Sequence, residues 1–395
     1  MEKNMKAQLF FKFIIKSLVR QLLKVLWIFP VRKNRILFNT FMGKHFSCNP
    51  KYMFLDLYAK YGDRLEYIWC RNEYDTELAA YSNVRTVKFR SFRYVFVLCT
   101  CGVYITNNGV DSYIPKRKKQ LFIDTWHGGG AYKSLDKVNK QSVVEASRRS
   151  VLTDYFVSSC AAFTKNLSAQ WCADVTKFLP VGMPRNDLLL REKDNATLKD
   201  TIKVSAGIPL NKKVVLYAPT FRGIAISPDS FDLTLDAGIL LSSLERRFGG
   251  EFMFLFRCHY TMLKKIQAGD NVLDVSSYND MQELLLAADV LVTDYSSSIW
   301  DWSLMFKPCF LFTPDLDEYD AKQGFYTPFS EWPFPYGKTN EELSQVIVAF
   351  DEEAYRKAVR RHHEQLGSFE KGTATAAVNT IIEKHIGISS VERKQ

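Results

Sequence analysis

Short apolar segments that alternate with helical segments constrain the fold of this chain more than any other feature. In the first half, stretches rich in β-branched and aromatic residues predict strands at residues 35–39, 65–69, 84–89, 103–106, 121–125 and 155–158. Between them, residues 50–61 and 92–101 have helical spacing. Near-continuous apolar strands joined by helices are typical of a parallel sheet covered on both faces.

The same alternation resumes after a polar stretch at residues 191–203. Strands are expected at residues 213–219, 252–256, 272–275, 290–293 and 309–312, and helices at 234–247, 279–287, 298–306 and across 340–386. A chain of 395 residues exceeds one ordinary core. The pattern therefore predicts an α/β protein with two doubly wound, Rossmann-type domains and a boundary near residues 185–210. The active site is expected in the cleft between them, at the carboxyl ends of the strands.

The expected domain division has three parts. Residues 1–31 form an amphipathic N-terminal helix, residues 32–190 the first Rossmann-like domain, and residues 191–395 the second. The last helix of the second domain could pack back on the first.

Composition limits the class of protein and its partners. With 47% hydrophobic and 24% charged residues, the chain is expected to be an ordered globular protein. Its net charge of +10 favours an anionic partner: nucleic acid, an acidic membrane surface or a phosphate-rich substrate. The eight cysteines have no disulfide or zinc spacing, which predicts reduced thiols in a cytosolic protein. The sequence has no acidic cluster of the kind that binds magnesium, so no metal is expected, and no cofactor is expected either.

The N-terminal segment, residues 6–31, is apolar but regularly interrupted by charge. Lys12, Lys16, Arg20 and Lys24 are four residues apart and would form one basic stripe on a helix. No uncharged run approaches the roughly 18–20 residues of a spanning helix, and no signal-peptide cleavage site follows. We expect a helix lying in the membrane interface, on an anionic surface. The alternative is an amphipathic helix packed on the body of the protein.

One histidine precedes a run of three glycines in the first half. His127 ends an apolar stretch, and Gly128, Gly129, Gly130 and then Lys133 follow it. Glycine lets backbone N–H groups approach an anion closely, and histidine is suited to moving protons near neutral pH. The combination predicts a site for phosphoryl chemistry with an anion- or acceptor-binding loop. The alternative is that the glycines only form a tight turn.

Anion-binding residue types also follow several strands of the second half. They are Thr220, Arg222, His259, Asp294, Ser296 and Ser297. Arg222 offers a planar fork that matches phosphate oxygens, and serines at a helix start can cap it or bind phosphate. Each has another explanation: a helix cap, a surface ion pair, or a histidine within the core. Their recurrence at the ends of several strands favours a diphosphate site.

Taken in order, six motifs resemble the CDP-glycerol glycerophosphotransferase family, the teichoic acid primases and polymerases of bacterial envelope synthesis. They are T-W-H-G-G-G-A-Y-K (125–133), Y-A-P-T-F-R (217–222), R-C-H (257–259), V-T-D-Y-S-S (292–297), D-L-D-E-Y (315–319) and G-F-Y (324–326). The resemblance covers residues 35–385. It implies a GT-B-like fold, with an acceptor-side first domain and a CDP-donor-binding second domain. It also implies a lipid-linked glycan acceptor and a peripheral location on the inner face of the cell membrane.

The resemblance implies roles for individual residues. His127 would be the catalytic base and His259 a second essential histidine near the donor phosphates. Arg222, Ser296 and Ser297 would contact the diphosphate, and Asp294, a weaker candidate, would orient the loop.

The chain also departs from the family pattern. Its polymerases commonly carry H-G-T-P-L-K where this chain has H-G-G-G-A-Y-K. The acceptor and the role of Lys133 therefore stay open, and a capsular glycan is as plausible as a wall teichoic acid.

The expected reaction is attack of an acceptor hydroxyl, deprotonated by His127, on the phosphorus that carries the polyol. CMP leaves and a phosphodiester forms, with CDP-glycerol or CDP-ribitol as the substrate. One alternative is a GT-B glycosyltransferase that uses a nucleotide sugar. A second is a non-catalytic protein that binds membranes or anionic polymers. Nucleic acid is not an expected partner, because the chain has no recognised module for it.

Overall fold

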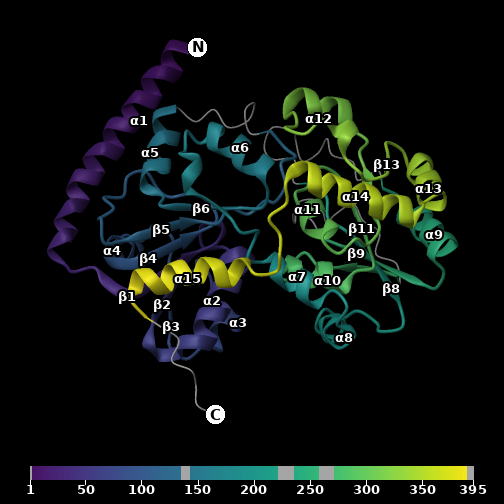
Figure 1. Ribbon diagram of the computed structural model, residues 1–395, viewed down its shortest axis with the longest axis horizontal. Coiled ribbons are helices and arrows are strands. Elements are labelled where there is room, and N and C mark those ends of the chain that lie inside the picture. Colours follow the sequence, from purple (N-terminus) through teal and green to yellow (C-terminus); the bar gives the residue numbers. More distant parts are fainter. Residues whose placement is uncertain (1, 135–142, 221–234, 258–270, 389–395) are drawn as a thin grey trace. The chain divides into compact units, whose positions relative to one another are not determined.

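The named β-strands that the structure describes all run parallel to their neighbours, in two separate sheets (Figure 1). The computed structural model describes residues 2–134, 143–220, 235–257 and 271–388. Each sheet belongs to its own unit. Unit 1 comprises Met1–His127, Asn139–Asp187 and Phe369–Gln395, and unit 2 comprises Gly128–Val138 and Leu188–Ser368.

The sheet of unit 1 has seven strands in the order β3-β2-β1-β4-β5-β6-β7. Their bounds are β1 (Arg32–Asn39), β2 (Glu66–Cys70), β3 (Val84–Val87), β4 (Cys101–Thr106), β5 (Leu121–Asp124), β6 (Tyr155–Ser158) and β7 (Phe178–Pro180). The chain starts in the middle of the sheet and reverses its direction of growth between β1 and β4. In parallel α/β sheets, this point of reversal is where ligands bind.

Helices cover both faces of this sheet. The helices of unit 1 are α1 (Glu2–Leu23), α2 (Cys48–Tyr61), α3 (Thr76–Ala79), α4 (Phe92–Thr100), α5 (Val143–Leu152), α6 (Ala161–Gln170) and α15 (Ala374–Ile386), while α7 (Asn186–Glu192) begins in unit 1 and lies mostly in unit 2. In Figure 1, α5 and α6 lie on one side of the sheet and α2 and α15 on the other. The last helix, α15, packs against α2, where Asn379 donates to the Met53 carbonyl and to the Asp56 carboxylate.

The sheet of unit 2 repeats the same winding with six strands, in the order β10-β9-β8-β11-β12-β13. Its strands are β8 (Lys213–Tyr217), β9 (Phe252–Phe256), β10 (Val272–Asp274), β11 (Val290–Thr293), β12 (Cys309–Phe312) and β13 (Tyr336–Gly337). Its helices are α8 (Ala196–Ser205), α9 (Ala237–Phe248), α10 (Met281–Ala287), α11 (Ser298–Ser303), α12 (Leu316–Lys322), α13 (Asn340–Val348) and α14 (Glu352–Leu366). The reversal here falls between β8 and β11.

The prediction of two parallel, Rossmann-type sheets is confirmed. Every predicted strand is present, but two of the edge strands, β7 and β13, were not predicted. They are three and two residues long, too short to show a hydrophobic period. The expected helical region 340–386 is three helices, and Gly367 ends the second of them, α14, in a left-handed conformation. Six of the described cysteines are buried and none forms a disulfide, while Cys172 is exposed.

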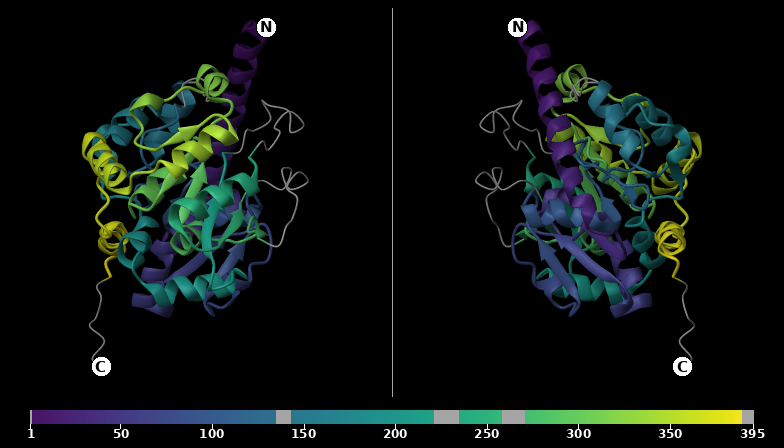
Figure 2. Two further views of the ribbon diagram at one scale, coloured as in Figure 1. Left: turned by 90° about the vertical axis from the view of Figure 1, so that its right-hand side faces the viewer. Right: turned by 90° about the vertical axis from the view of Figure 1, so that its left-hand side faces the viewer.

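The N-terminal helix is present over Glu2–Leu23 and continues as a 3-10 turn, η1 (Lys24–Ile28), at one side of unit 1 (Figure 2). The Arg117 guanidinium fastens this turn, because it donates to the carbonyls of Trp27 and Phe29. Of the expected basic stripe, Lys16 and Arg20 lie in α1, and the side chain of Lys12 is outside the described part. Among the described residues, no helix combines the length and apolarity needed to cross a membrane.

Aromatic side chains form the core between the sheet of unit 1 and α2. Phe38 and Trp69, on neighbouring strands, stack with ring centroids 4.9 Å apart. Phe46 and Phe54 meet the Trp69 ring edge-on at 4.7 and 5.7 Å. Each buried aromatic ring removes a large apolar surface from water, so this cluster contributes much of the stability of unit 1.

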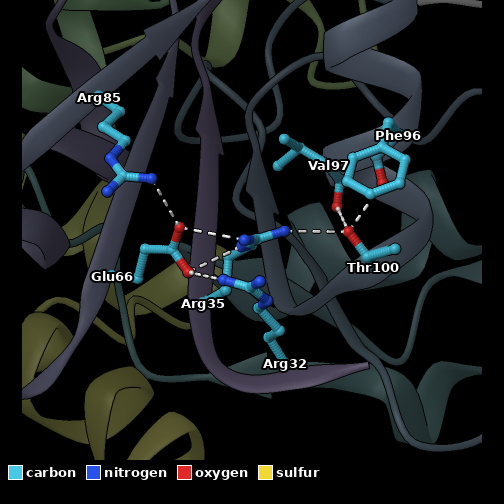
Figure 3. A network of polar contacts seen from close by, with 7 residues as sticks. All are labelled: Arg32, Arg35, Glu66, Arg85, Phe96, Val97 and Thr100. Carbon is cyan, nitrogen blue, oxygen red and sulfur yellow. Dashed lines mark hydrogen bonds and ion pairs between the residues drawn. The ribbon is translucent and has the colours of Figure 1, made fainter. Parts of the chain in front are cut away.

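A network of charged side chains closes the amino-terminal edge of the same sheet (Figure 3). Arg35, in β1, is 6% exposed and makes two hydrogen bonds to the Glu66 carboxylate, at 2.9 and 3.1 Å. It makes a third, of 3.1 Å, to Thr100 at the end of α4. Burial acts to raise the pKa of the Glu66 carboxyl, but the pKa is lowered because Arg35 donates to it and further guanidinium groups surround it. The network therefore ties β1, β2 and α4 together.

Replacing Glu66 with Gln should destabilise unit 1, because the buried Arg35 loses its counter-charge. We expect a loss of about 2 kcal/mol in the free energy of unfolding, measured by urea denaturation. Arg85→Gln is the matched control: its side chain is 66% exposed and 3.6 Å from the same carboxylate. Its loss should stay below about 0.5 kcal/mol. Equal losses in the two variants would contradict the assigned role of Arg35.

Candidate active site

The backbone around His127 makes a strained turn at the carboxyl end of β5, in unit 1. The Thr125 N–H donates to the Thr106 carbonyl over 2.8 Å, which continues the sheet by one residue. Trp126 then has a φ of 52°, in the left-handed region that is unfavourable for a bulky residue. Its N–H donates over 2.9 Å to the Asp124 carboxyl. The turn thus directs His127 away from the strand.

The imidazole of His127 is oriented by its neighbours. Its Nδ1 lies 2.7 Å from the carbonyl oxygen of Asn107, which follows β4. A carbonyl can only accept, so Nδ1 carries the proton and Nε2 carries the lone pair of the neutral ring. The rings of Trp126 and Phe41 flank it, with centroids 4.3 and 5.6 Å away. This tautomer is the one that a general base needs.

The buried carboxyl of Asp124 accepts a hydrogen bond from the turn, and its contribution to folding stability depends on pH. Asp124 is 3% exposed, and burial raises the pKa of its carboxyl to about 7, although backbone N–H groups of Trp126 and Gly109 and the charge of Arg149 act to lower it. The protonated carboxyl still accepts from the Trp126 N–H.

The glycine run lies in unit 2 and has a packing role there. A Cβ atom on Gly129 would fall 2.1 Å from Cδ1 of the buried Trp300, and Gly130 has a φ of 67°. The segment is bonded to residues after α12: the main chain of Lys133 pairs with Phe325, and the Tyr326 N–H donates to the Tyr132 carbonyl. These contacts require glycine at two of the three positions without any ligand.

Four of the predicted donor-binding residues lie at the point of reversal in unit 2. The Thr220 N–H donates to both oxygens of Asp294 at 2.8 and 3.0 Å, and its hydroxyl donates to Oδ1 at 2.7 Å. Ser297 precedes α11 and makes no side-chain cap, while the Ser296 hydroxyl accepts from the Ser298 hydroxyl at 3.0 Å. The structure therefore brings Thr220, Asp294, Ser296 and Ser297 to one edge of one sheet.

Asp294 is 2% exposed, so its contacts with Thr220 join the loops after β8 and β11. The next loop is linked as well, because the Tyr295 hydroxyl donates to Asp315, after β12, over 3.0 Å. Two predicted site residues, Arg222 and His259, lie outside the described residues. Arg257, two residues before His259, is described: its N–H continues the β8–β9 ladder and its guanidinium donates to the Tyr278 carbonyl.

The sequence did not predict the residues that hold the His127 turn. Asn49, at the start of α2, and Arg185, before α7, donate to main-chain carbonyls of the turn. The only local signal is the polar stretch P-R-N-D at residues 184–187, which follows the end of a strand. Nothing in the sequence relates it to His127, 58 residues earlier.

Comparison with known proteins decides the family. The family described as CDP-Glycerol:Poly(glycerophosphate) glycerophosphotransferase matches residues 21–384. The chain belongs to this family. The resemblance seen in the motifs is thereby confirmed, and with it the assignment to a family of phosphotransferase enzymes in teichoic acid synthesis.

Relatives of this glycerophosphotransferase-family chain include polymerases and a primase. It is 28% identical to the teichoic acid poly(glycerol phosphate) polymerase of Bacillus spizizenii, over 95% of this chain and 98% of that protein. It is also 28% identical to a teichoic acid ribitol-phosphate primase of the same species, over 74% of this chain and 77% of that protein. The chain spans 51% of the length of a 29% identical Staphylococcus epidermidis polymerase.

Among solved structures, the wall teichoic acid polymerase TagF, soaked with CDPG, is similar to the family member described here. The TM-score is 0.80, at 25% sequence identity and with 97% of each chain covered. The similarity supports the two parallel-sheet units described above.

Replacing Asp124 with Asn should change how stability depends on pH. The folded pKa is about 7 and the ordinary value is 3.8, so wild-type folding binds a proton between these values. The contribution of Asp124 is fully present below pH 3.8 and is lost as pH rises to about 7. Relative to wild type, the Asn variant should gain stability across this window, by at most about 1.4 kcal/mol per pH unit. Thermal unfolding of both proteins from pH 4 to 8 tests this, and parallel curves would contradict it.

Proposed function

We propose that this protein transfers a polyol phosphate, glycerol phosphate in the first place, from a CDP-linked donor to a hydroxyl of a lipid-linked glycan acceptor. CMP is the leaving group, and the product belongs to a teichoic acid or a related surface polymer such as a capsule. The observation that carries the proposal is the family match over residues 21–384. His127 lies within these residues and is in the tautomer of a general base.

In the proposed step, Nε2 of His127 accepts the proton of the acceptor hydroxyl. The hydroxyl oxygen then forms a bond to the phosphorus that carries the polyol, and the bond from this phosphorus to the bridging oxygen of CMP breaks. The Nδ1–H···O=C bond to Asn107 supports this role, because it keeps the lone pair on Nε2. Transfer of this kind depends mainly on positioning and on charge stabilisation.

We assign donor binding to unit 2 and the acceptor side to unit 1, as expected for a GT-B-like fold. Thr220, Asp294, Ser296 and Ser297 share the edge where the winding of the unit 2 sheet reverses, which supports a diphosphate site there. Arg222 and His259 complete the proposed set. The proposal needs no metal and no cofactor, since the CDP-polyol is a substrate.

We further propose that α1 and η1 lie on the inner face of the cell membrane. Large apolar side chains of this segment are exposed: Leu18 by 60%, Leu22 by 73% and Ile28 by 76%. Lys16, Arg20 and Lys24 lie on the same segment and would meet anionic headgroups. Exposed apolar surface next to basic residues supports an interfacial helix over one that only packs on the protein.

Replacing His127 with Ala should lower the transfer rate by at least about 100-fold, because the acceptor hydroxyl loses its base. Wild type and variant would each be incubated with a lipid-linked acceptor and CDP-glycerol, CDP-ribitol or UDP-sugars. The released nucleotide and the product mass are measured. His385→Ala, in α15 of the same unit, is the control and should keep full activity.

Each outcome of this experiment has one meaning. CMP release with a CDP-polyol supports the proposal, and near-wild-type release by a folded His127→Ala variant removes His127 as the base. UDP release with a UDP-sugar would instead support a glycosyltransferase. Binding of acceptor polymer without any release would support a non-catalytic protein.

Replacing Leu22 with Glu should weaken binding to anionic vesicles by at least about tenfold, since a buried leucine side chain contributes about 2 kcal/mol. Flotation with phosphatidylglycerol vesicles measures it. Val204→Glu, in α8, is the matched control, because its side chain is 65% exposed in the wild type. Vesicle binding that is equal in all three proteins would refute the membrane role of this segment.

A further inference from the structure

We propose that Arg185 and Asn49 are positioning residues for the catalytic base. They touch no reacting atom in this proposal, but they hold the backbone turn from which the His127 imidazole projects. The inference rests on the proposed role of His127.

Asn49 holds the first two carbonyls of the turn. Its Nδ2 donates to the Thr125 oxygen at 3.1 Å and to the Trp126 oxygen at 3.0 Å. Asn49 is fully buried, and an amide has two N–H groups to give. Asn49 thus gives both carbonyls a donor from outside the turn, and the Trp126 oxygen also accepts from the Thr125 hydroxyl at 3.2 Å.

Arg185 holds the third carbonyl. Its Nη1 donates to the His127 oxygen at 2.7 Å and lies 3.2 Å from the Cys48 sulfur. The bond comes from a guanidinium that is only 6% exposed, so it is a charge-assisted bond in a poorly solvated place. Two side chains from outside the turn thus donate to the carbonyl groups of three consecutive residues.

The two positioning residues are themselves connected. The Arg185 N–H donates to Oδ1 of Asn49 at 3.1 Å, so the asparagine uses both ends of its amide. On either side of Arg185, the Met183 N–H and the Asn186 amide donate to the Glu370 carboxylate, both at 3.0 Å. The hydrogen bonds that support the His127 turn therefore come from a network that includes the start of α2, the loop after β7 and the segment before α15.

The turn needs the hydrogen bonds from Asn49 and Arg185 because its conformation is unfavourable by itself. A left-handed φ costs Trp126 about 1–2 kcal/mol, which the chain would recover by relaxing. Relaxation would swing the next residue, His127, away from the Asn107 carbonyl. A displacement of about 1 Å at a reacting group can cost about 100-fold in rate.

The test compares two variants with two matched controls. Arg185→Met and Asn49→Ala remove the proposed positioning contacts. Arg35→Met and Asn379→Ala make the same substitutions in the same unit, and their side chains are equally exposed: 6% for both arginines and 0% for both asparagines. Both controls lie away from the His127 turn. Steady-state CMP release, donor binding and the melting temperature are measured for all four and for Arg185→Lys.

We expect kcat to fall about 10- to 100-fold in Arg185→Met and Asn49→Ala, with the KM for the donor within about twofold of wild type. Arg185→Lys should recover part of kcat, because an ammonium can still donate to the carbonyl. The controls should lose melting temperature to a similar extent but keep kcat. This split separates positioning from a general loss of stability.

Three results would overturn the inference: kcat unchanged in both variants, an equal fall of kcat in the controls, or a raised KM for the donor at normal kcat. None of these affects the proposed function as long as the wild type transfers polyol phosphate. Absence of transfer by the wild type would remove the proposed function first. Full activity of His127→Ala would remove the base that these residues are proposed to position.

Discussion

Parallel pairing of every named strand creates the constraint on which both units depend. In a parallel sheet the chain leaves each central strand at the same edge, and the main-chain groups there must find partners outside the ladder. Each unit solves this with side chains from distant segments. In unit 2 the Asp294 carboxylate accepts from Thr220, and in unit 1 Asn49 and Arg185 donate to the turn at His127. The same bonds that satisfy the backbone also fix the groups at the edge.

The contacts of Asp294 have the opposite polarity to those of Asn49 and Arg185. In unit 2 the Asp294 carboxylate accepts from the N–H and the hydroxyl of Thr220, whereas in unit 1 an amide and a guanidinium donate to the carbonyls of the turn. A further carbonyl at the unit 1 edge, that of Asn107, accepts from His127 itself, which fixes the proton on Nδ1. The protein uses a neutral acceptor here, and a carbonyl selects the tautomer without placing a negative charge beside the ring.

Much of the fold could be predicted from local sequence, and the candidate site only in part. The strands at residues 155–158, 252–256, 290–293 and 309–312 have the predicted bounds, because each is a buried apolar run with polar residues after it. The same rule singled out His127, Thr220 and Asp294. It could not find Asn49 or Arg185, whose partners are 76 and 58 residues away. Their role depends on the order of strands in the sheet, which no local pattern records.

The glycine run after His127 illustrates how one pattern can have two physical causes. An anion-binding loop requires glycine so that a ligand can reach the backbone, and close packing requires it so that another side chain can. At Gly129 the Cβ position lies within the indole of Trp300, and at Gly130 it lies 2.5 Å from the Tyr132 ring. Trp300 in turn packs on His363, and Tyr132 is bonded to His362. Burial lowers the pKa of both histidines to about 4, so both are neutral members of an apolar core. Packing therefore accounts for Gly129 and Gly130 without an anion, and His127 stays the residue of the motif whose geometry points to chemistry.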